Sequence, residues 1–421
     1  MKDATKCLHA GYTPENGGPG VMPIVQSTTY VFNTTKEVGD LFDMPTAHMY
    51  SRFSNPTSAV VEAKIAELEG GVGAMCTSSG QAASFYSVFN ICEAGDHFVC
   101  TSALYGGTYN LFAVTFKKFG IDCTFVDQDA PEEEIQKAFR PNTKCVFGET
   151  ISNPSLQVLD IEKMARIAHK NGVPLIVDNT FATPINCRPF EHGADIVMHS
   201  TTKYMDGHAT QVGGVVVDSG KFDWRAAGKF PEIDGPSEGY HGLNLYDAFG
   251  NQAFIVKCRV DGMRDFGCCP SAFDAYLMLL GLETLSLRVK HEVESTYKLA
   301  EFCRNHPKVE RVSFVGFEDH PSHELAKKYF RHGASAVLTI ELKGDLESTV
   351  KFVESLKLSG NMTMIGDSIS VVTHPASTTH KQLSDEAKRA AGITPTLLRI
   401  SLGLENVEDI IADYEEALSK I

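Results

Sequence analysis

The sequence has little of what metal centres, disulfide frameworks and nucleic-acid surfaces are built from. Its 11 cysteines are odd in number and include no CxxC pair, so we expect reduced, mostly buried thiols in a cytoplasmic protein. The 15 histidines form no HExxH motif, and we predict no metal. A net charge of −15 argues against nucleic acid or an anionic membrane as a partner.

Long apolar runs are absent as well. Residues 1–20 contain none, so we predict no signal peptide, and no stretch elsewhere has the length to span a bilayer. Apolar residues make up 43% of the chain and charged residues 22%, which is typical of a soluble globular protein. Because 421 residues exceed what one ordinary core contains, we predict two domains.

The first chemically informative stretch surrounds Lys203. The apolar run Ile196–Met198 is typical of a short buried strand, and Ser200, Thr201 and Thr202 separate it from the lysine. A lysine just past a buried strand end loses hydration, which lowers its pKa and leaves a nucleophilic amine. Such an amine condenses with the aldehyde of pyridoxal 5′-phosphate (PLP), whose phosphate the neighbouring hydroxyls could hold. The alternative is an ordinary solvated lysine in a loop.

Asp178 strengthens the PLP hypothesis. It ends the apolar run Val173–Val177, which predicts a second buried strand. PLP acts as an electron sink only while its pyridine nitrogen stays protonated, and a buried carboxylate opposite that nitrogen ensures this. The carboxyl ends of neighbouring parallel strands share one sheet edge, where such sheets bind ligands. Taken alone, Asp178 is better explained as an N-cap for the next segment.

Asp178 with Asn179-Thr180, and the run Ser200–Tyr204, resemble the signature of the PLP-dependent enzymes of cysteine and methionine metabolism. The resemblance extends from about His9 to Glu405. It implies PLP as cofactor and PLP-dependent transferase fold type I, the aspartate-aminotransferase-like fold.

The expected fold is therefore of the α/β class. Apolar runs from about Gly73 to Val217 indicate about seven strands that alternate with helices, which predicts a mostly parallel sheet. A smaller C-terminal α+β domain follows. We expect an N-terminal arm over residues 1–58, a PLP-binding large domain over 59–270 and a small domain over 271–421.

A phosphate site is predicted at Gly80 and Gln81. They lie where a strand candidate gives way to a helical run, and the free N–H groups at a helix start bind anions, although such turns are common. The resemblance implies that Gly80 and Gln81 bind the PLP phosphate through their amides. Ser200 and Thr202 are expected to bind it through their hydroxyls.

Tyr50 and Arg52 belong to the arm, where side chains are usually solvated. Directly after them, Asn55 as N-cap and Pro56 as first helical residue predict a helix. By resemblance, Tyr50 and Arg52 cross a dimer interface and bind the PLP phosphate of the neighbouring subunit. We therefore expect a homo-oligomer, a dimer of subunits that share active sites, assembled as a tetramer.

The remaining site residues are expected to act on the substrate. Arg399 lies in an apolar strand candidate, where its partner is either a substrate carboxylate or a structural salt bridge. The resemblance implies the former. It also implies that Asn153, otherwise a turn residue, lies between the ring hydroxyl and that carboxylate, and that Ser370 lies near the substrate. Tyr105 is expected to stack on the ring and to assist Lys203 in catalysis.

The resemblance implies a γ-replacement in methionine biosynthesis by direct sulfhydrylation. O-acetyl-L-homoserine and sulfide, or methanethiol, would give homocysteine, or methionine, and acetate. Gly107 stands where methionine γ-lyases typically have cysteine, and Ile369 where cystathionine enzymes often have glutamate. The segment 218–267 resembles that of O-acetylhomoserine sulfhydrylases, being longer than in cystathionine-type relatives.

Two alternatives stay open. Within the same class, a methionine or homocysteine γ-lyase or a cystathionine γ-synthase would bind PLP in the same way. Outside it, a regulator or binding module could keep the fold, but the presence of Lys203, Asp178, Tyr105 and Arg399 disfavours this.

Overall fold

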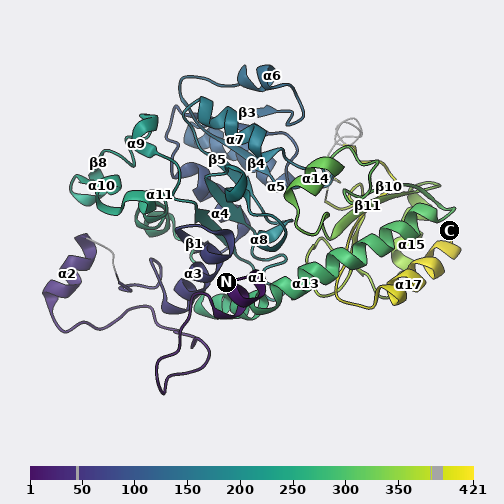
Figure 1. Ribbon diagram of the computed structural model, residues 1–421, viewed down its shortest axis with the longest axis horizontal. Coiled ribbons are helices and arrows are strands. Elements are labelled where there is room, and N and C mark those ends of the chain that lie inside the picture. The colour runs from purple at the N-terminus through teal and green to yellow at the C-terminus, as the bar shows by residue number, and fades with distance from the viewer. Residues whose placement is uncertain (44–46, 380, 382–391) are drawn as a thin grey trace.

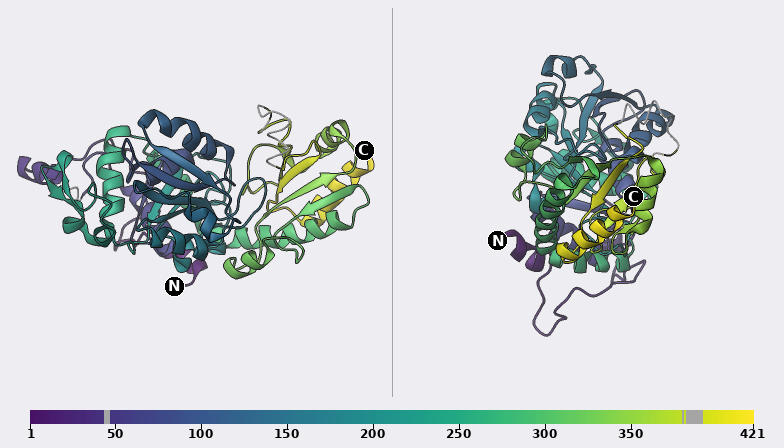
Figure 2. Two further views of the ribbon diagram at one scale, coloured as in Figure 1. Left: turned by 90° about the horizontal axis from the view of Figure 1, so that it is seen from above. Right: turned by 90° about the vertical axis from the view of Figure 1, so that its right-hand side faces the viewer.

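The chain folds into two units that lie side by side along its longest axis, each around its own sheet (Figures 1 and 2). The structure is a computed structural model that describes residues 1–43, 47–379, 381 and 392–421. In this part of the chain, no helix combines the length and the apolar character needed to cross a membrane.

The larger unit contains a seven-stranded sheet of strand order β1-β7-β6-β5-β4-β2-β3. Its strands are β1 (Gly73–Thr77), β2 (His97–Thr101), β3 (Asp122–Val126), β4 (Thr143–Glu149), β5 (Leu175–Asp178), β6 (Ile196–His199) and β7 (Gly214–Asp218). All pairings are parallel except those of β7 with β6 and with β1. The prediction of a mostly parallel sheet is confirmed. Strand β7 reverses because turns without a helix connect it to β6, and a parallel connection needs a crossover.

Apolar side chains cover both faces of this sheet, as its runs of branched and aromatic residues require. One face packs against α3 (Pro56–Glu69), α7 (Ile161–Lys170) and the start of α13 (Ala272–Asn305), and the other against α4 (Gly80–Phe89) and α11 (Ala253–Lys257). Shorter helices of this unit are α5 (Gly106–Asn110), α6 (Glu132–Gln136), α8 (Thr183–Asn186), α9 (Trp224–Ala227), α10 (Leu245–Phe249) and α12 (Arg264–Phe266). A two-stranded ribbon, β8 (Pro236–Ser237) with β9 (Leu243–Asn244), completes it.

The smaller unit is built on a five-stranded sheet of order β10-β11-β14-β13-β12. The strands are β10 (Val309–Ser313), β11 (Val337–Leu342), β12 (Gly360–Asn361), β13 (Val371–Thr373) and β14 (Leu397–Ser401), and helices α14 (His323–Tyr329), α15 (Leu346–Ser355) and α17 (Val407–Ser419) accompany them. The 34-residue helix α13 runs without a break from the first unit into the second (Figure 1).

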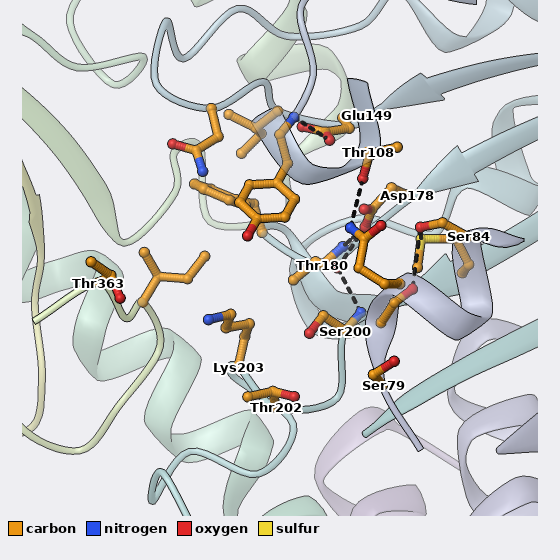
Figure 3. A pocket seen from close by; sticks show the side chains of 18 of the residues that line it. Ser79, Ser84, Thr108, Glu149, Asp178, Thr180, Ser200, Thr202, Lys203 and Thr363 are labelled. Carbon is orange, nitrogen blue, oxygen red and sulfur yellow. Dashed lines mark hydrogen bonds between the residues drawn. The ribbon is translucent and has the colours of Figure 1, made fainter. Parts of the chain in front are cut away.

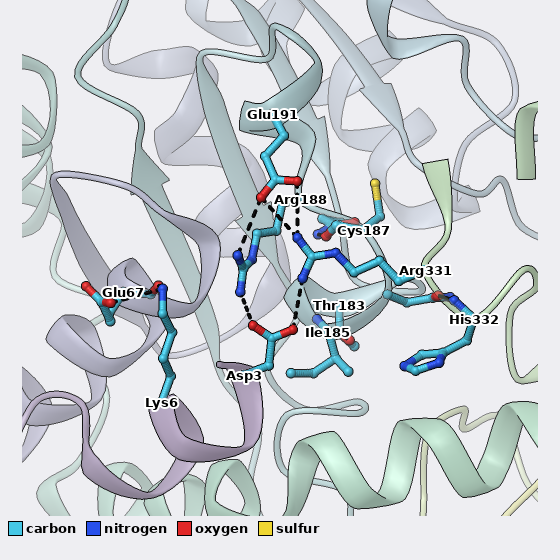
Figure 4. Close-up of polar contacts among 12 residues, drawn as sticks. Asp3, Lys6, Glu67, Thr183, Ile185, Cys187, Arg188, Glu191, Arg331 and His332 are labelled. Carbon is cyan, nitrogen blue, oxygen red and sulfur yellow. Dashed lines mark hydrogen bonds and ion pairs between the residues drawn. The ribbon is translucent and has the colours of Figure 1, made fainter. Parts of the chain in front are cut away.

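The first ten residues depart from the extended arm that the sequence predicts. Residues Asp3–His9 form helix α1, which packs on α3 and α13 because Cys7 is fully buried and Lys64 of α3 donates to its carbonyl oxygen at 2.6 Å. Asp3 also pairs with Arg188 and, at 2.9 Å, with Arg331 of the smaller unit (Figure 4). These contacts hold the N-terminus against both units.

The rest of the arm extends away from the body of the chain (Figure 1). It carries helix α2 (Thr35–Asp43) and an isolated bridge between Thr29 and Tyr50. It ends at Asn55, whose side chain caps α3 by accepting from the N–H of Thr57, as predicted.

Candidate active site

A cavity of about 270 Å³ lies at the carboxyl edge of the large sheet and reaches Arg399 of the smaller unit. Nine of the predicted site residues line it, namely Gly80, Gln81, Tyr105, Asn153, Asp178, Ser200, Thr202, Lys203 and Arg399. Figure 3 shows how several of these side chains converge from different elements on the same hollow. Asn153, Asp178 and Lys203 are distant in sequence and meet because β4, β5 and β6, which precede or contain them, are parallel and adjacent.

Lys203 lies in the turn that follows β6, as the sequence predicts. Its Nζ is 3.3 Å from Sδ of Met364, which is a weak hydrogen-bond acceptor. Burial, and to a lesser extent the positive charge of Arg399, lowers the pKa of the Lys203 amine to about 8. About a tenth of the amine is therefore neutral and nucleophilic at pH 7, far more than for an ordinary lysine.

Asp178 ends β5, directly beside β6. Its Oδ1 accepts a hydrogen bond from the Thr180 N–H at 2.9 Å and another from the Thr180 hydroxyl at 2.5 Å. Thr180 Oγ1 accepts in turn from the N–H of Ser200 at 2.8 Å. The carboxylate and the turn that carries Lys203 are thus joined through one hydroxyl.

One end of the cavity suits an anion. Ser79 caps α4 by accepting from the N–H of Ala82, which leaves the amides of Gly80 and Gln81 at a helix start without intrahelical acceptors. A Cβ on Gly80 would lie 2.5 Å from Cβ of Ser200, so only glycine allows this close approach. The amides and the Ser200 hydroxyl consequently surround the same space.

Arg399 lies on β14, where it is 7% exposed. Its guanidinium donates to Asn153 Oδ1 at 3.0 Å, to the Met364 carbonyl at 3.2 Å and to the Thr373 hydroxyl at 3.2 Å. These partners are neutral. Burial lowers the pKa of Arg399 to about 10, so the group stays charged at neutral pH and suits an anion in the cavity.

Three predicted site residues do not line this cavity. The Ser370 hydroxyl is buried and donates to Glu405 at 2.8 Å while accepting from the N–H of Gly403. Tyr50 and Arg52 line a separate hollow together with Cys269 at the base of α13. Their guanidinium and ring lie against each other, with 5.5 Å between the Arg52 Cζ and the Tyr50 ring centroid.

Sequence reasoning missed several residues of the site, and Glu149 and Met364 are the two with direct contacts to predicted residues that matter most here. Glu149 ends β4, lines the cavity and accepts a hydrogen bond from the N–H of Tyr105 at 2.7 Å. Met364 contacts the Lys203 amine. A lone carboxylate at the end of an apolar strand, the signal that identified Asp178, would also have identified Glu149. The sequence around Met364 carries no comparable signal.

The family model of the Cys/Met metabolism PLP-dependent enzymes matches residues 4–419. The chain belongs to this family. The enzyme is 46% identical to the homocysteine synthase of Schizosaccharomyces pombe over 98% of this chain and 96% of that protein. It is 44% identical to O-acetyl-L-homoserine sulfhydrylase 1 of Thermus thermophilus over the full length of both.

A crystal structure has the same fold throughout. That protein, assigned as an O-acetylhomoserine (thiol)-lyase of Campylobacter jejuni, shares 35% identity and a TM-score of 0.95, with 100% of both chains covered. It contains N′-pyridoxyl-lysine-5′-monophosphate. The predicted family, fold type and cofactor of the enzyme are confirmed.

The residues at the cavity fit PLP. The amine of Lys203 has a lowered pKa, as an amine that condenses with an aldehyde needs. The helix start at Gly80 lies close to Ser200, so backbone N–H donors and a hydroxyl donor line the same part of the cavity and suit an anion. Asp178 offers a carboxylate on the same edge for a protonated ring nitrogen.

Proposed function

We propose that the enzyme catalyses γ-replacement on O-acetyl-L-homoserine. The incoming group is sulfide or methanethiol, and the products are homocysteine or methionine, respectively, and acetate. The observation that carries this proposal is the identity of 43–46% over nearly the whole chain to proteins named homocysteine synthase or O-acetyl-L-homoserine sulfhydrylase. The reaction would be the direct sulfhydrylation step of methionine biosynthesis.

PLP, when bound, supplies an electron sink that stabilises negative charge at the substrate Cα. We assign its aldehyde to Lys203 and its ring nitrogen to Asp178. Its phosphate is assigned to the amides of Gly80 and Gln81 and to the hydroxyls of Ser200 and Thr202, all of which line one cavity. Tyr105, half exposed in this chain, would lie against the ring face.

Arg399 and Asn153 would hold the substrate carboxylate. Their hydrogen bond orients the guanidinium before any substrate arrives, so less rotational freedom is lost on binding. Holding the carboxylate fixes the direction of the Cα–H bond. The Lys203 amine, whose pKa of about 8 lies close to neutral pH, would accept the proton from Cα and return it during the reaction. Ser370 would act indirectly, through the backbone near Glu405 and Gly403.

Two features favour replacement over elimination and over cystathionine as a substrate. A Cβ at Gly107 would lie 2.6 Å from Cε1 of Tyr105, so the cysteine expected in methionine γ-lyases would displace the Tyr105 ring from its position in this chain. Ile369 is half exposed and offers no carboxylate to a distal ammonium group. The alternatives are a methionine or homocysteine γ-lyase and a cystathionine γ-synthase.

We also propose that two chains share each active site. Tyr50 and Arg52 lie on the exposed arm and line a hollow outside their own chain's cavity, so a neighbouring subunit would receive them at its phosphate site. The assembly would be a tetramer made of such dimers and located in the cytoplasm.

Product analysis tests the reaction. The enzyme is supplied with O-acetylhomoserine, with and without saturating sulfide, and homocysteine is compared with 2-oxobutyrate and ammonia. We expect homocysteine to dominate when sulfide is present. Predominant 2-oxobutyrate at saturating sulfide would instead assign the enzyme to the γ-lyases.

A further inference from the structure

Two carboxyl groups face the same cavity from adjacent strands. Glu149 ends β4 and Asp178 ends β5, and the two residues are direct partners in the parallel ladder. Parallel strands lie about 5 Å apart, so the two side chains leave the sheet edge as close neighbours. Two carboxylates at paired positions of neighbouring strands repel each other, which disfavours the ionisation of both near neutral pH.

The hydrogen bonds of Asp178 favour its charged form. One of its oxygens receives both the N–H and the hydroxyl of Thr180. His199 at the end of β6 favours the anion electrostatically, and its Nε2 lies 2.6 Å from Oε1 of the buried Glu69, which anchors the ring. Burial outweighs these effects and raises the pKa of Asp178, whereas the pKa of Glu149 is raised well above its ordinary value.

The surroundings of Glu149 favour its neutral form. It is 4% exposed, and the hydrogen bonds of the described residues give it a single donor, the N–H of Tyr105. The titratable groups that face it are Asp178 on β5 and Cys100 on β2, while Lys203 and Arg399 lie on other sides of the cavity. Burial first, and then the charge of Asp178, raises the pKa of Glu149 well above its ordinary value.

We propose that Glu149 is a positioning residue that works as a neutral carboxylic acid. Its carbonyl oxygen accepts the Tyr105 N–H and so holds the turn that presents the Tyr105 ring to the cofactor. Because Glu149 keeps its proton, Asp178 carries the negative charge that pairs with the ring nitrogen of PLP. This inference rests on the role proposed above for Asp178.

Three variants of the loaded enzyme test it: Glu149→Gln, Glu149→Ala and Asp178→Asn. Glutamine has the shape of a protonated glutamate and keeps the carbonyl acceptor. We measure PLP affinity, the visible absorption of bound PLP from pH 6 to pH 9, melting temperature and kcat/KM. The absorption and the affinity do not depend on which substrate the enzyme uses, so they separate this inference from the reaction proposed above.

Glu149→Gln should keep the absorption spectrum and its pH dependence, with kcat/KM within about threefold of the wild type. Glu149→Ala leaves the Tyr105 N–H without its acceptor, so the turn that carries Tyr105 is no longer held in place. This variant should lose about 10- to 100-fold in kcat/KM. Asp178→Asn should weaken PLP binding and lose about 100-fold or more, because it removes the charge itself.

A tenfold or greater loss in Glu149→Gln, or an absorption spectrum that changes with pH as that of Asp178→Asn does, would overturn the inference by showing that the ionised carboxylate is needed. Wild-type behaviour of Glu149→Ala would overturn the positioning role. If Glu149→Ala does not fold, the glutamine variant decides alone. Wild-type PLP affinity in Asp178→Asn would overturn the proposed role of Asp178 and the inference with it.

Discussion

Replacing Lys203 with methionine should stabilise the apoprotein, although it should abolish turnover. In the folded chain, burial and Arg399 lower the pKa of this amine from 10.5 to about 8, so folding disfavours its ammonium form. That difference is equivalent to about 3 kcal/mol of free energy of unfolding. Because water reaches an amine that lines an open cavity, we discount this to about 1–2 kcal/mol.

The direction of the pH dependence follows from proton linkage. Below pH 8 the amine is protonated in both the folded and the unfolded chain, so the full destabilisation is present. Between pH 8 and 10.5 the unfolded chain binds more protons than the folded chain, and stability rises with pH. The advantage of Lys203→Met should therefore be largest at pH 7 and should shrink as the pH approaches 10.5.

Lys64 provides a matched control. This lysine is also buried, but its Nζ donates to the carbonyls of Cys7 at 2.6 Å and Leu8 at 3.2 Å. Lys64→Met would leave two carbonyl groups without that donor and should destabilise the chain by about 1–3 kcal/mol. Thermal and urea unfolding of both variants is compared with the wild type after removal of PLP, since bound cofactor adds stability of its own. If Lys203→Met melts at or below the wild type at pH 7, or its advantage does not shrink with rising pH, the buried ammonium group does not destabilise the folded chain.

Three further predictions concern the substrate, the cofactor and the assembly. Arg399→Lys loses the guanidinium's paired donors and should raise KM for the amino-acid substrate about 10- to 100-fold with little change in melting temperature. Arg288→Lys is the control. It loses hydrogen bonds to the buried carbonyls of Tyr204, Met205 and Gly281 and should mainly lower the melting temperature. The opposite pattern in steady-state kinetics and calorimetry would exclude Arg399 as the carboxylate site. Gly107→Ala places a Cβ 2.6 Å from the Tyr105 ring and should weaken PLP binding, measured by fluorescence titration. Gly106→Ala, whose Cβ would meet nothing within 4 Å, should leave PLP binding unchanged. Equal affinities of the two variants would contradict the close packing at Gly107. Arg52→Ala and Lys203→Ala, each inactive alone, should recover about a quarter of wild-type activity when they are unfolded and refolded together as random dimers. No recovery, with heterodimers confirmed by mass, would place Arg52 in its own chain's site.

The sequence identified the site best where chemistry coincides with the end of a strand. Asp178 and Lys203 follow short apolar runs, and because those runs form adjacent parallel strands, their side chains meet. Arg399 was identifiable for a related reason, since a charged residue in the middle of an apolar run needs a partner.

Other features depend on tertiary contacts that no local pattern encodes. Helix α1 forms because Cys7 and Asp3 find partners on α3 and in the smaller unit, so residues with little apolar character pack where an extended arm was predicted. Strand β13 has three residues, too few for a recognisable alternation. The contact between Met364 and Lys203 joins two units through a loop, and residue spacing gives no information about it.

Helix α13 sets the spacing between the two halves of the active site. It contacts α1, α3 and α8 near its start and β10, β11 and α17 further along, so it belongs to both units at once. At about 1.5 Å per residue its 34 residues form a rod of about 51 Å. A bend of about 5° at the middle of this rod would move either end by only about 2 Å, so bending α13 changes the distance between Arg399 on β14 and Lys203 beyond β6 only slightly. Evolution can lengthen an exposed loop at little cost, but one residue inserted into α13 would turn everything beyond it by about 100°. The length of α13 therefore determines how far apart the two halves of the active site lie, although its own side chains do not line the cavity.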